Sequence, residues 1–173
     1  MNSYDIAETF GQMSKREVAL LKACALSLPD DAIIVNIGAG FGTSAAAMLE
    51  EKPNSLIFSV DKFKRTEEKD NLIKCGLDHL RVVRILGNSS DIGRVWFIDL
   101  DLLFVDGGHS REVVQDDINL WTPFVKFGGF ILFHDYNHRN CPWITELVDH
   151  WEYSTPNLKL VGKERYLAAF RRT

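Results

Sequence analysis

The feature that most constrains the fold of this chain is a repeated alternation between short apolar runs and stretches with helical periodicity. The expected strands cover residues 32–37, 56–60, 80–86, 100–105 and 129–133; the first is a continuous apolar run, whereas charged residues such as Arg81 and Arg84 interrupt others. A continuous apolar run of this length is typical of a strand that is buried on both faces of a parallel sheet. The alternation therefore predicts an α/β fold with a doubly wound, mostly parallel sheet and helices on both faces.

Helix signals stand between the apolar runs. Ser14 precedes Glu17 by three residues, which is the capping-box pattern, and Pro29 ends the helix that follows. Thr66 and Ser110 are expected to cap two further helices. The expected helices cover residues 14–28, 43–51, 66–75, 90–97, 110–121 and 142–151.

The tail and the length complete the fold prediction. Residues 158–170 have the pattern of a hairpin about Gly162, so we expect a C-terminal antiparallel strand. A chain of 173 residues without internal repeats or linkers predicts a single domain over residues 1–173. Residues 1–13 show little periodicity, and we expect them to form a flexible arm or part of a substrate lid.

Composition excludes several classes of protein. There are 20 basic and 24 acidic residues, a net charge of −4, which argues against a partner held by nucleic-acid phosphates. The sequence shows neither an apolar run long enough to span a membrane nor a secretory signal. The three cysteines are far apart and fit neither a disulfide framework nor a zinc site. We expect a soluble cytoplasmic protein.

Polar residues follow each predicted strand of the parallel sheet. They are Asn36–Gly42, Asp61, Gly87–Ser89, Asp106–His109 and His134–Asp135. In doubly wound sheets, ligands bind beyond the carboxyl ends of the strands, near the point where the strand order reverses. We therefore expect these clusters to meet at one ligand site.

The first cluster contains three closely spaced glycines, Gly38, Gly40 and Gly42. Glycine lets a chain turn sharply out of a strand and lets a ligand approach the backbone N–H groups at a helix N-terminus. The third glycine comes one residue earlier than in the dinucleotide pattern G-x-G-x-x-G. Asp61 ends the next predicted strand, where a carboxylate can accept hydrogen bonds from both hydroxyls of a ribose. The alternative for Asp61 is a solvated loop acid.

Taken together, these segments resemble the class I S-adenosylmethionine-dependent methyltransferases. The similarity lies in Val35–Ser44, Asp61, Gly87–Ser89, Phe104–Ser110 and Gly128–Tyr136. The strings VDGGHS and GGFILFHDY are similar to a branch of small methyltransferase domains related to sugar and macrolide O-methyltransferases. The resemblance implies a Rossmann-like methyltransferase fold, with the C-terminal hairpin as its closing strands.

The resemblance also implies which residues bind S-adenosylmethionine. The implied set is Asn36, Gly38, Gly40, Gly42, Asp61, Asn88, Ser89 and Asp106. Gly38 and Gly40 would face the amino-acid end of the cofactor, Asp61 the ribose, Asn88 and Ser89 the adenine, and Asp106 the region beside the sulfonium. Asn36 and Asn88 stand where the family often has acids, which implies weaker cofactor binding or a domain that has lost activity.

Methyl transfer to oxygen or nitrogen needs an aligned acceptor and a group that takes its proton. His109 and His134 lie at the expected sheet edge, and imidazole titrates near neutral pH. Together with Asp135 they are the candidate catalytic residues. The alternative is that each histidine only binds loop backbone.

Asp106 and Asp135 end neighbouring predicted strands, so their carboxylates could converge on a metal ion. Mg²⁺ would lower the pKa of a bound acceptor hydroxyl, and some relatives in the family are metal-dependent at comparable strand ends. Tyr136 follows the second acid here in place of another acid or amide, which departs from that pattern.

The leading prediction is a methyltransferase that acts on oxygen of a small hydroxylated or sugar-like acceptor. The alternatives are an NAD-dependent oxidoreductase and a non-catalytic binding module of the same fold. Because no insertion is long enough for a lid, a homodimer is a further expectation. Asp116 and Asp117 are interpreted as a solvated helix face, and residues 62–65 as exposed loop charge.

Overall fold

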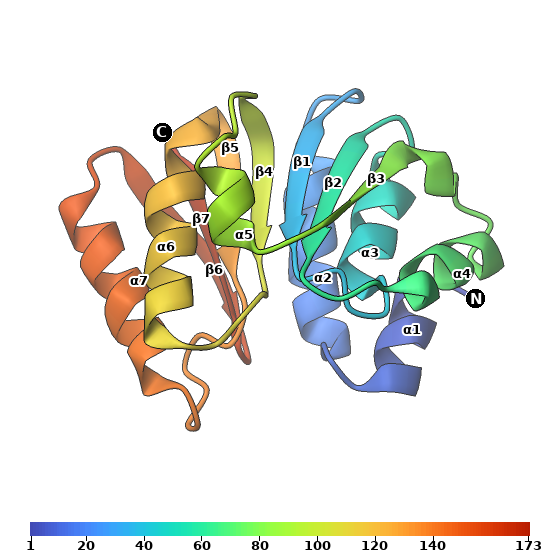
Figure 1. The fold of residues 1–173 in the computed structure, drawn as a ribbon, viewed down its shortest axis with the longest axis horizontal. Coiled ribbons are helices and arrows are strands. Elements are labelled where there is room, and N and C mark those ends of the chain that lie inside the picture. The colour runs from blue at the N-terminus through green and yellow to red at the C-terminus, as the bar shows by residue number, and fades with distance from the viewer.

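The computed structural model describes all 173 residues, which form a seven-stranded sheet with the order β3-β2-β1-β4-β5-β7-β6 (Figure 1). The strands are β1 (Ile33–Ile37), β2 (Leu56–Asp61), β3 (Val82–Leu86), β4 (Leu100–Val105), β5 (Val125–Phe133), β6 (Leu158–Glu164) and β7 (Leu167–Arg172). Strands β1 to β5 pair in parallel, whereas β7 pairs antiparallel with both β5 and β6. The predicted fold class is confirmed.

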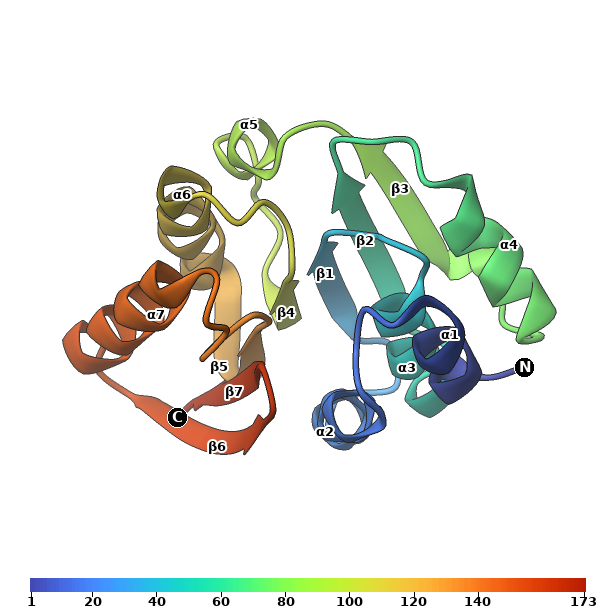
Figure 2. The ribbon, with the colours of Figure 1, turned by 90° about the horizontal axis from the view of Figure 1, so that it is seen from below.

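Helices cover both faces of the sheet. They are α1 (Ser3–Phe10), α2 (Lys15–Leu26), α3 (Thr43–Glu51), α4 (Thr66–Lys74), α5 (Ser89–Gly93), α6 (Arg111–Trp121) and α7 (Pro142–Ser154). Figure 2 shows α1 to α4 on one face and α5 to α7 on the other. Two apolar clusters, one on each side, bury the sheet between them.

The strand order reverses at β1, which has β2 on one side and β4 on the other. The register pairs Ile37 with Val60 of β2 and with Val105 of β4, so these three strands end at the same edge. Crossovers on opposite faces separate the loops at this point and leave a crevice. The polar clusters predicted at strand ends therefore converge there.

Two predicted helix starts are confirmed in detail. The Ser14 hydroxyl accepts from the Glu17 backbone while the Glu17 carboxylate accepts from the Ser14 backbone, which completes the capping box. Ser110 caps α6 by accepting from the backbone of Val113. Thr66 is not a cap: Arg65 holds the N-cap position of α4 without a side-chain hydrogen bond.

The C-terminal hairpin forms, but its turn is not at Gly162. That residue lies inside β6, at a shift in the pairing with β7, and a Cβ there would come within 2.6 Å of Leu20. The chain turns at Arg165 and Tyr166, where Arg165 has a positive φ of 50°. Close packing against α2, rather than a turn, requires the glycine.

Residues 3–10 differ from the expected flexible arm because they form α1. Asn2 and Asp5 make a capping box, and Ile6 is fully buried. Ser3 donates to Glu50 of α3 through both its backbone and its hydroxyl. A role of residues 1–13 as a lid stays a prediction. No helix of the fold has the length and apolar character needed to cross a membrane.

Candidate active site

A cavity of about 440 Å³ opens where the strand order reverses. Gln12 and Met13, which join α1 to α2, line it together with residues from the strand ends. Of the residues predicted for the site, those in the lining are Gly38, Gly40, Asp61, Asn88, Ser89, Asp106, His109, His134 and Asp135. The sheet edge thus gathers most of the predicted set, and Asn36 and Gly42 are the exceptions.

Gly38 follows the last residue of β1 and packs against the backbone of Asp106, the residue after β4. Its φ is 91°, and a Cβ there would lie 1.9 Å from the carbonyl oxygen of Asp106, so no other residue fits. Gly40 has a φ of 50°, and a Cβ would meet the side chain of Gln12 at 2.6 Å. The turn therefore leaves backbone rather than side chains at this part of the cavity wall.

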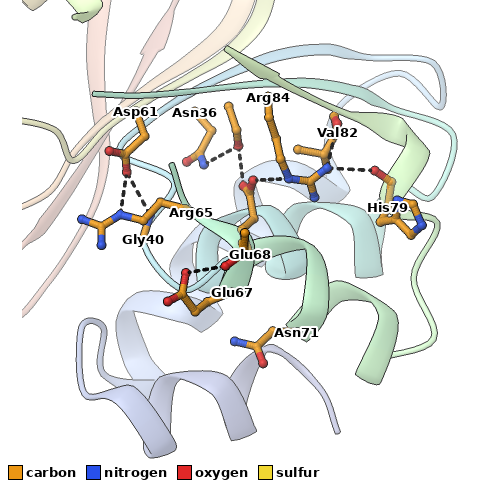
Figure 3. Close-up of polar contacts among 12 residues, drawn as sticks. Asn36, Gly40, Asp61, Arg65, Glu67, Glu68, Asn71, His79, Val82 and Arg84 are labelled. Atoms are coloured by element: carbon orange, nitrogen blue, oxygen red, sulfur yellow. Dashed lines mark hydrogen bonds and ion pairs between the residues drawn. The ribbon is translucent and has the colours of Figure 1, made fainter. Parts of the chain in front are cut away.

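Asp61 ends β2 and faces the glycine turn (Figure 3). Its Oδ1 accepts from the backbone N–H of Phe63 at 2.8 Å. Its Oδ2 accepts from the Gly40 N–H at 3.4 Å and from Arg65 Nε at 3.3 Å. The carboxylate is thus held at the cavity, with one of its oxygens paired to Arg65.

Asn36 does not reach the cavity, which corrects its predicted role. It is fully buried, its Oδ1 accepts from Ser44, and its Nδ2 donates to Ser59 at 3.0 Å. Ser59 in turn donates to Glu68, which pairs with Arg84 (Figure 3). A donor is needed at position 36 because the Ser59 hydroxyl hydrogen goes to Glu68, and an ionised acid cannot donate.

The buried Glu68 explains the departure at position 36 physically. Burial raises the pKa of Glu68, and the Ser59 hydroxyl and Arg84 offset part of this effect. A second carboxylate at position 36 would leave Ser59 between two acids. Gly42 also belongs to this side of the fold: with φ 85° it is the N-cap of α3, and a Cβ would press on Glu68 at 3.1 Å.

His134 lies buried between three carboxylates. Its Nδ1 is 3.2 Å from Asp106 and 3.6 Å from Asp135, and its Nε2 is 3.5 Å from Glu17. Burial alone would lower the pKa of His134, but these carboxylates outweigh it and raise the pKa to about 12. The ring is therefore a cation at neutral pH. It balances the surrounding acids and does not fit the predicted role of proton acceptor.

His109 is placed differently. Its Nε2 lies 2.9 Å from Oδ2 of Asp135, and its side chain is 55% exposed at the cavity mouth. The hydrogen bond to Asp135 raises the pKa of His109, and burial offsets part of this effect. Burial would raise the pKa of Asp135, yet its bonds to His109 and His134 hold it well below the ordinary value. An imidazole oriented by an ionised carboxylate is a recurrent form of general base.

The residues predicted to bind Mg²⁺, Asp106 and Asp135, both lie near Nδ1 of His134. Ligand atoms of Asp106, His134 and Asp135 lie within 4.8 Å of one another. Mg²⁺ prefers an octahedral shell of oxygen atoms. Here an imidazole stands between the two carboxylates, and Asp135 also holds His109. As they are placed, these residues do not form an oxygen shell for Mg²⁺.

Two residues of the site region escaped the sequence interpretation. Glu17 is buried, with 1% of its surface exposed. Its carboxylate accepts hydrogen bonds from the backbone N–H groups of Ser14 and Tyr166 and also faces His134. Asp117 is fully buried, not solvated. Its signal was present, because Asp117 shares the helical spacing of Val114, Ile118 and Trp121 on the buried face of α6. For Glu17 no local signal exists beyond the capping box.

The fold and the cavity define a doubly wound α/β protein with a cavity at its topological switch point, which is where proteins of this architecture bind their ligands. Residues 35–136 match a family model described as a methyltransferase domain. This match covers more than half of the chain, so the chain belongs to the methyltransferase domain family.

Comparisons with individual proteins agree. An uncharacterized protein of Acanthamoeba polyphaga mimivirus is 29% identical over 130 residues, 69% of this chain and 59% of that protein. A tRNA (guanine-N(7)-)-methyltransferase of Corynebacterium efficiens is 30% identical over 129 residues, 67% of this chain and 50% of that protein. The chain thus spans between 50% and 59% of the length of these relatives.

Among solved structures, the O-methyltransferase TomG from Streptomyces achromogenes, in complex with S-adenosylmethionine, is similar with a TM-score of 0.74. The alignment covers 99% of this chain and 87% of that chain at 15% identity. At this identity the similarity shows a shared fold.

Proposed function

We propose that this chain is an S-adenosylmethionine-dependent methyltransferase that methylates oxygen of a small hydroxylated or sugar-like acceptor. The observation that carries the proposal is the position of Asp61, whose carboxylate lies beside the Gly38–Gly42 turn in the lining of the cavity at the switch point. A carboxylate and a bare backbone turn on one cavity suit the ribose and the amino-acid portion of one adenosyl ligand.

Different residues of the cavity would bind different parts of the cofactor. Asp61 would accept the ribose hydroxyls, with Arg65 moving off its Oδ2. Asn88 and Ser89, at the start of α5, would bind the adenine edge, and Asp106 would lie near the sulfonium charge. When bound, S-adenosylmethionine supplies an electrophilic methyl group on a good leaving group. The protein therefore has to align the acceptor and remove its proton.

His109 is the base in this proposal, and Asp135 orients it. The acceptor hydroxyl would donate to the ring nitrogen of His109 that Asp135 does not hold, and the proton would move to that nitrogen as the C–O bond forms. The Asp135 carboxylate stabilises the resulting imidazolium. The lowered pKa values of Asp135 and Glu17 keep both residues ionised beside His134, so His109 remains the proton acceptor of the site.

The presence of a general base, His109, favours a hydroxyl oxygen over the N7 atom of guanine as the methyl acceptor. The Corynebacterium relative is named for the N7 atom of guanine in tRNA, and that atom carries no proton to be removed. A hydroxyl group does carry such a proton, and the His109–Asp135 pair could accept it. TomG, named as an O-methyltransferase, offers the nearer analogy. The net charge of −4 also supports a small acceptor rather than a nucleic acid. Cytoplasmic location and a homodimer stay predictions from sequence.

Turnover tests the proposal. The chain is incubated with S-adenosylmethionine and a panel of sugars, phenols and tRNA, and S-adenosylhomocysteine formation is measured. We expect product with small hydroxylated acceptors and its loss in His109→Ala, whereas His150→Ala, which removes an exposed histidine of α7, retains activity. Methylation of tRNA alone, oxidation of an alcohol with NAD, or cofactor binding without any turnover would contradict the proposal.

A further inference from the structure

The most unusual buried group outside the site described above is the carboxylate of Asp117. The residue has no exposed surface, and neither of its oxygens has a hydrogen-bond partner. Buried carboxylates are otherwise paired or hydrogen-bonded, because leaving them without partners costs free energy. No side chain or backbone group of the fold completes a hydrogen bond to this carboxylate.

Asp117 lies directly behind the cavity wall. A Cβ built on Gly107 would be 3.6 Å from its Oδ2, and Gly107 lines the cavity. The Ser89 hydroxyl is near enough to lower the pKa of Asp117, although it does not complete a hydrogen bond to either oxygen. Ser89 lines the cavity too, and its carbonyl accepts from Trp121 Nε1 at 3.2 Å, which ties α5 to α6.

The charged groups around Asp117 do not compensate for its burial. On α6 the neighbouring Asp116 adds repulsion. On α5, Arg94 already pairs with Asp91 at 3.1 Å and with Asp116 at 3.7 Å. On the loop after β4, Asp106 pairs with His134. Burial therefore dominates and raises the pKa of Asp117 to about 6, although Ser89 offsets part of the effect.

We propose that Asp117 is a positioning residue of the cofactor site, which accepts the Ser89 hydroxyl when the cofactor fills the cavity and releases its own proton to solvent in that step. The proposal rests on the proposed function and deepens it. Ser89 then presents its backbone to the adenine in one fixed orientation. The arrangement supplies from α6 the negative charge that Asn88 lacks at the end of β3.

Calorimetric titration with S-adenosylhomocysteine tests the proposal. Titrations at pH 6 in two buffers of different ionisation enthalpy give the number of protons released on binding. For a group whose pKa falls from about 6 by one unit or more, about 0.4 proton is released at this pH. The affinity of the wild type should correspondingly rise by about fivefold or more between pH 5 and pH 7.5.

Two variants and a matched control show whether the proton released on binding comes from Asp117. Asp117→Asn keeps the shape and loses the charge, and Ser89→Ala removes the donor. We expect both to lower the proton release and flatten the pH dependence of affinity. Glu112→Gln removes an exposed acid from the first turn of the same helix, and we expect wild-type behaviour.

The outcomes are distinct. Equal proton release in the wild type and Asp117→Asn would overturn the proposal, as would loss of the release in Glu112→Gln. No binding of S-adenosylhomocysteine to the wild type at any pH would contradict the proposed function itself, and with it this inference. Binding without proton release in the wild type would overturn only the role of Asp117.

Discussion

Glu17 Oε1 lies 3.5 Å from Nε2 of His134, so the first turn of α2 contacts the end of β5 inside the candidate active site. The same carboxylate accepts from the backbone of Tyr166 at 2.9 Å and closes the capping box with Ser14. One buried acid thus connects a helix start, the C-terminal hairpin and the cationic ring that balances Asp106 and Asp135.

Glu17 should stabilise the fold above pH 4.5. Burial would raise its pKa, but hydrogen bonds from His134, Ser14 and Tyr166 outweigh this and lower the pKa from 4.5 to about 2. The stabilisation is present above pH 4.5 and is lost as the pH falls toward 2. It amounts to at most about 3 kcal/mol. Denaturant unfolding should show Glu17→Gln destabilised at pH 7 and nearer to the wild type at pH 3; a difference independent of pH would contradict this.

The pH dependence of turnover should report His109. Because Asp135 raises the pKa of His109 above 6.5, kcat/KM should rise with pH through that raised value. In Asp135→Asn the His109 pKa falls, so the rising limb should move to lower pH while the maximal rate drops. His109→Ala should lose about 10²–10⁴-fold in rate. A rising limb that stays in place in Asp135→Asn would assign it to another group.

Asp117 should cost stability at neutral pH. Its folded pKa of about 6 lies above the ordinary value of 3.8 for aspartate, so stability is highest below pH 3.8 and falls as the pH rises through 6. The loss approaches about 3 kcal/mol. Relative to the wild type, Asp117→Asn should gain about that amount in unfolding free energy between pH 4 and pH 7.5. A constant difference between the two proteins across this range would show that Asp117 is not a raised acid.

Turnover should not depend on Mg²⁺. His134 stands between Asp106 and Asp135, and the ligand atoms available there do not form an oxygen shell. We expect the same rate in the presence of EDTA and after addition of Mg²⁺. Loss of activity in EDTA, with recovery on Mg²⁺ and on no other divalent ion, would show that His134 swings away to free both carboxylates.

Much of the fold follows from local patterns. The apolar runs place β1, β2 and β4 within one residue of their bounds, because strands buried on both faces need uninterrupted apolar sequence. Their polar ends predict the cavity residues, because parallel strands end at one edge. The hairpin turn is misplaced, because Gly162 serves contact with Leu20 across the fold, which no local pattern contains.

The site is predicted less completely, because pairing between distant elements decides charge and exposure. His134 has the same local appearance as His109, yet three acids from α2, β4 and β5 make it a buried cation. Asn36 sits at the predicted strand end but turns to Ser59 rather than to the cavity. Such roles depend on which neighbours the folded chain supplies.

The affinity of Asp61→Ala for S-adenosylhomocysteine, measured by calorimetry, tests the central claim most directly. Two hydrogen bonds to an ionised group are each worth about 1.5–3 kcal/mol, so we expect a loss of at least about tenfold. Asp99→Ala, which removes an exposed acid before β4, should bind as the wild type does. Unchanged affinity in Asp61→Ala would contradict the assignment of this cavity to an adenosyl ligand.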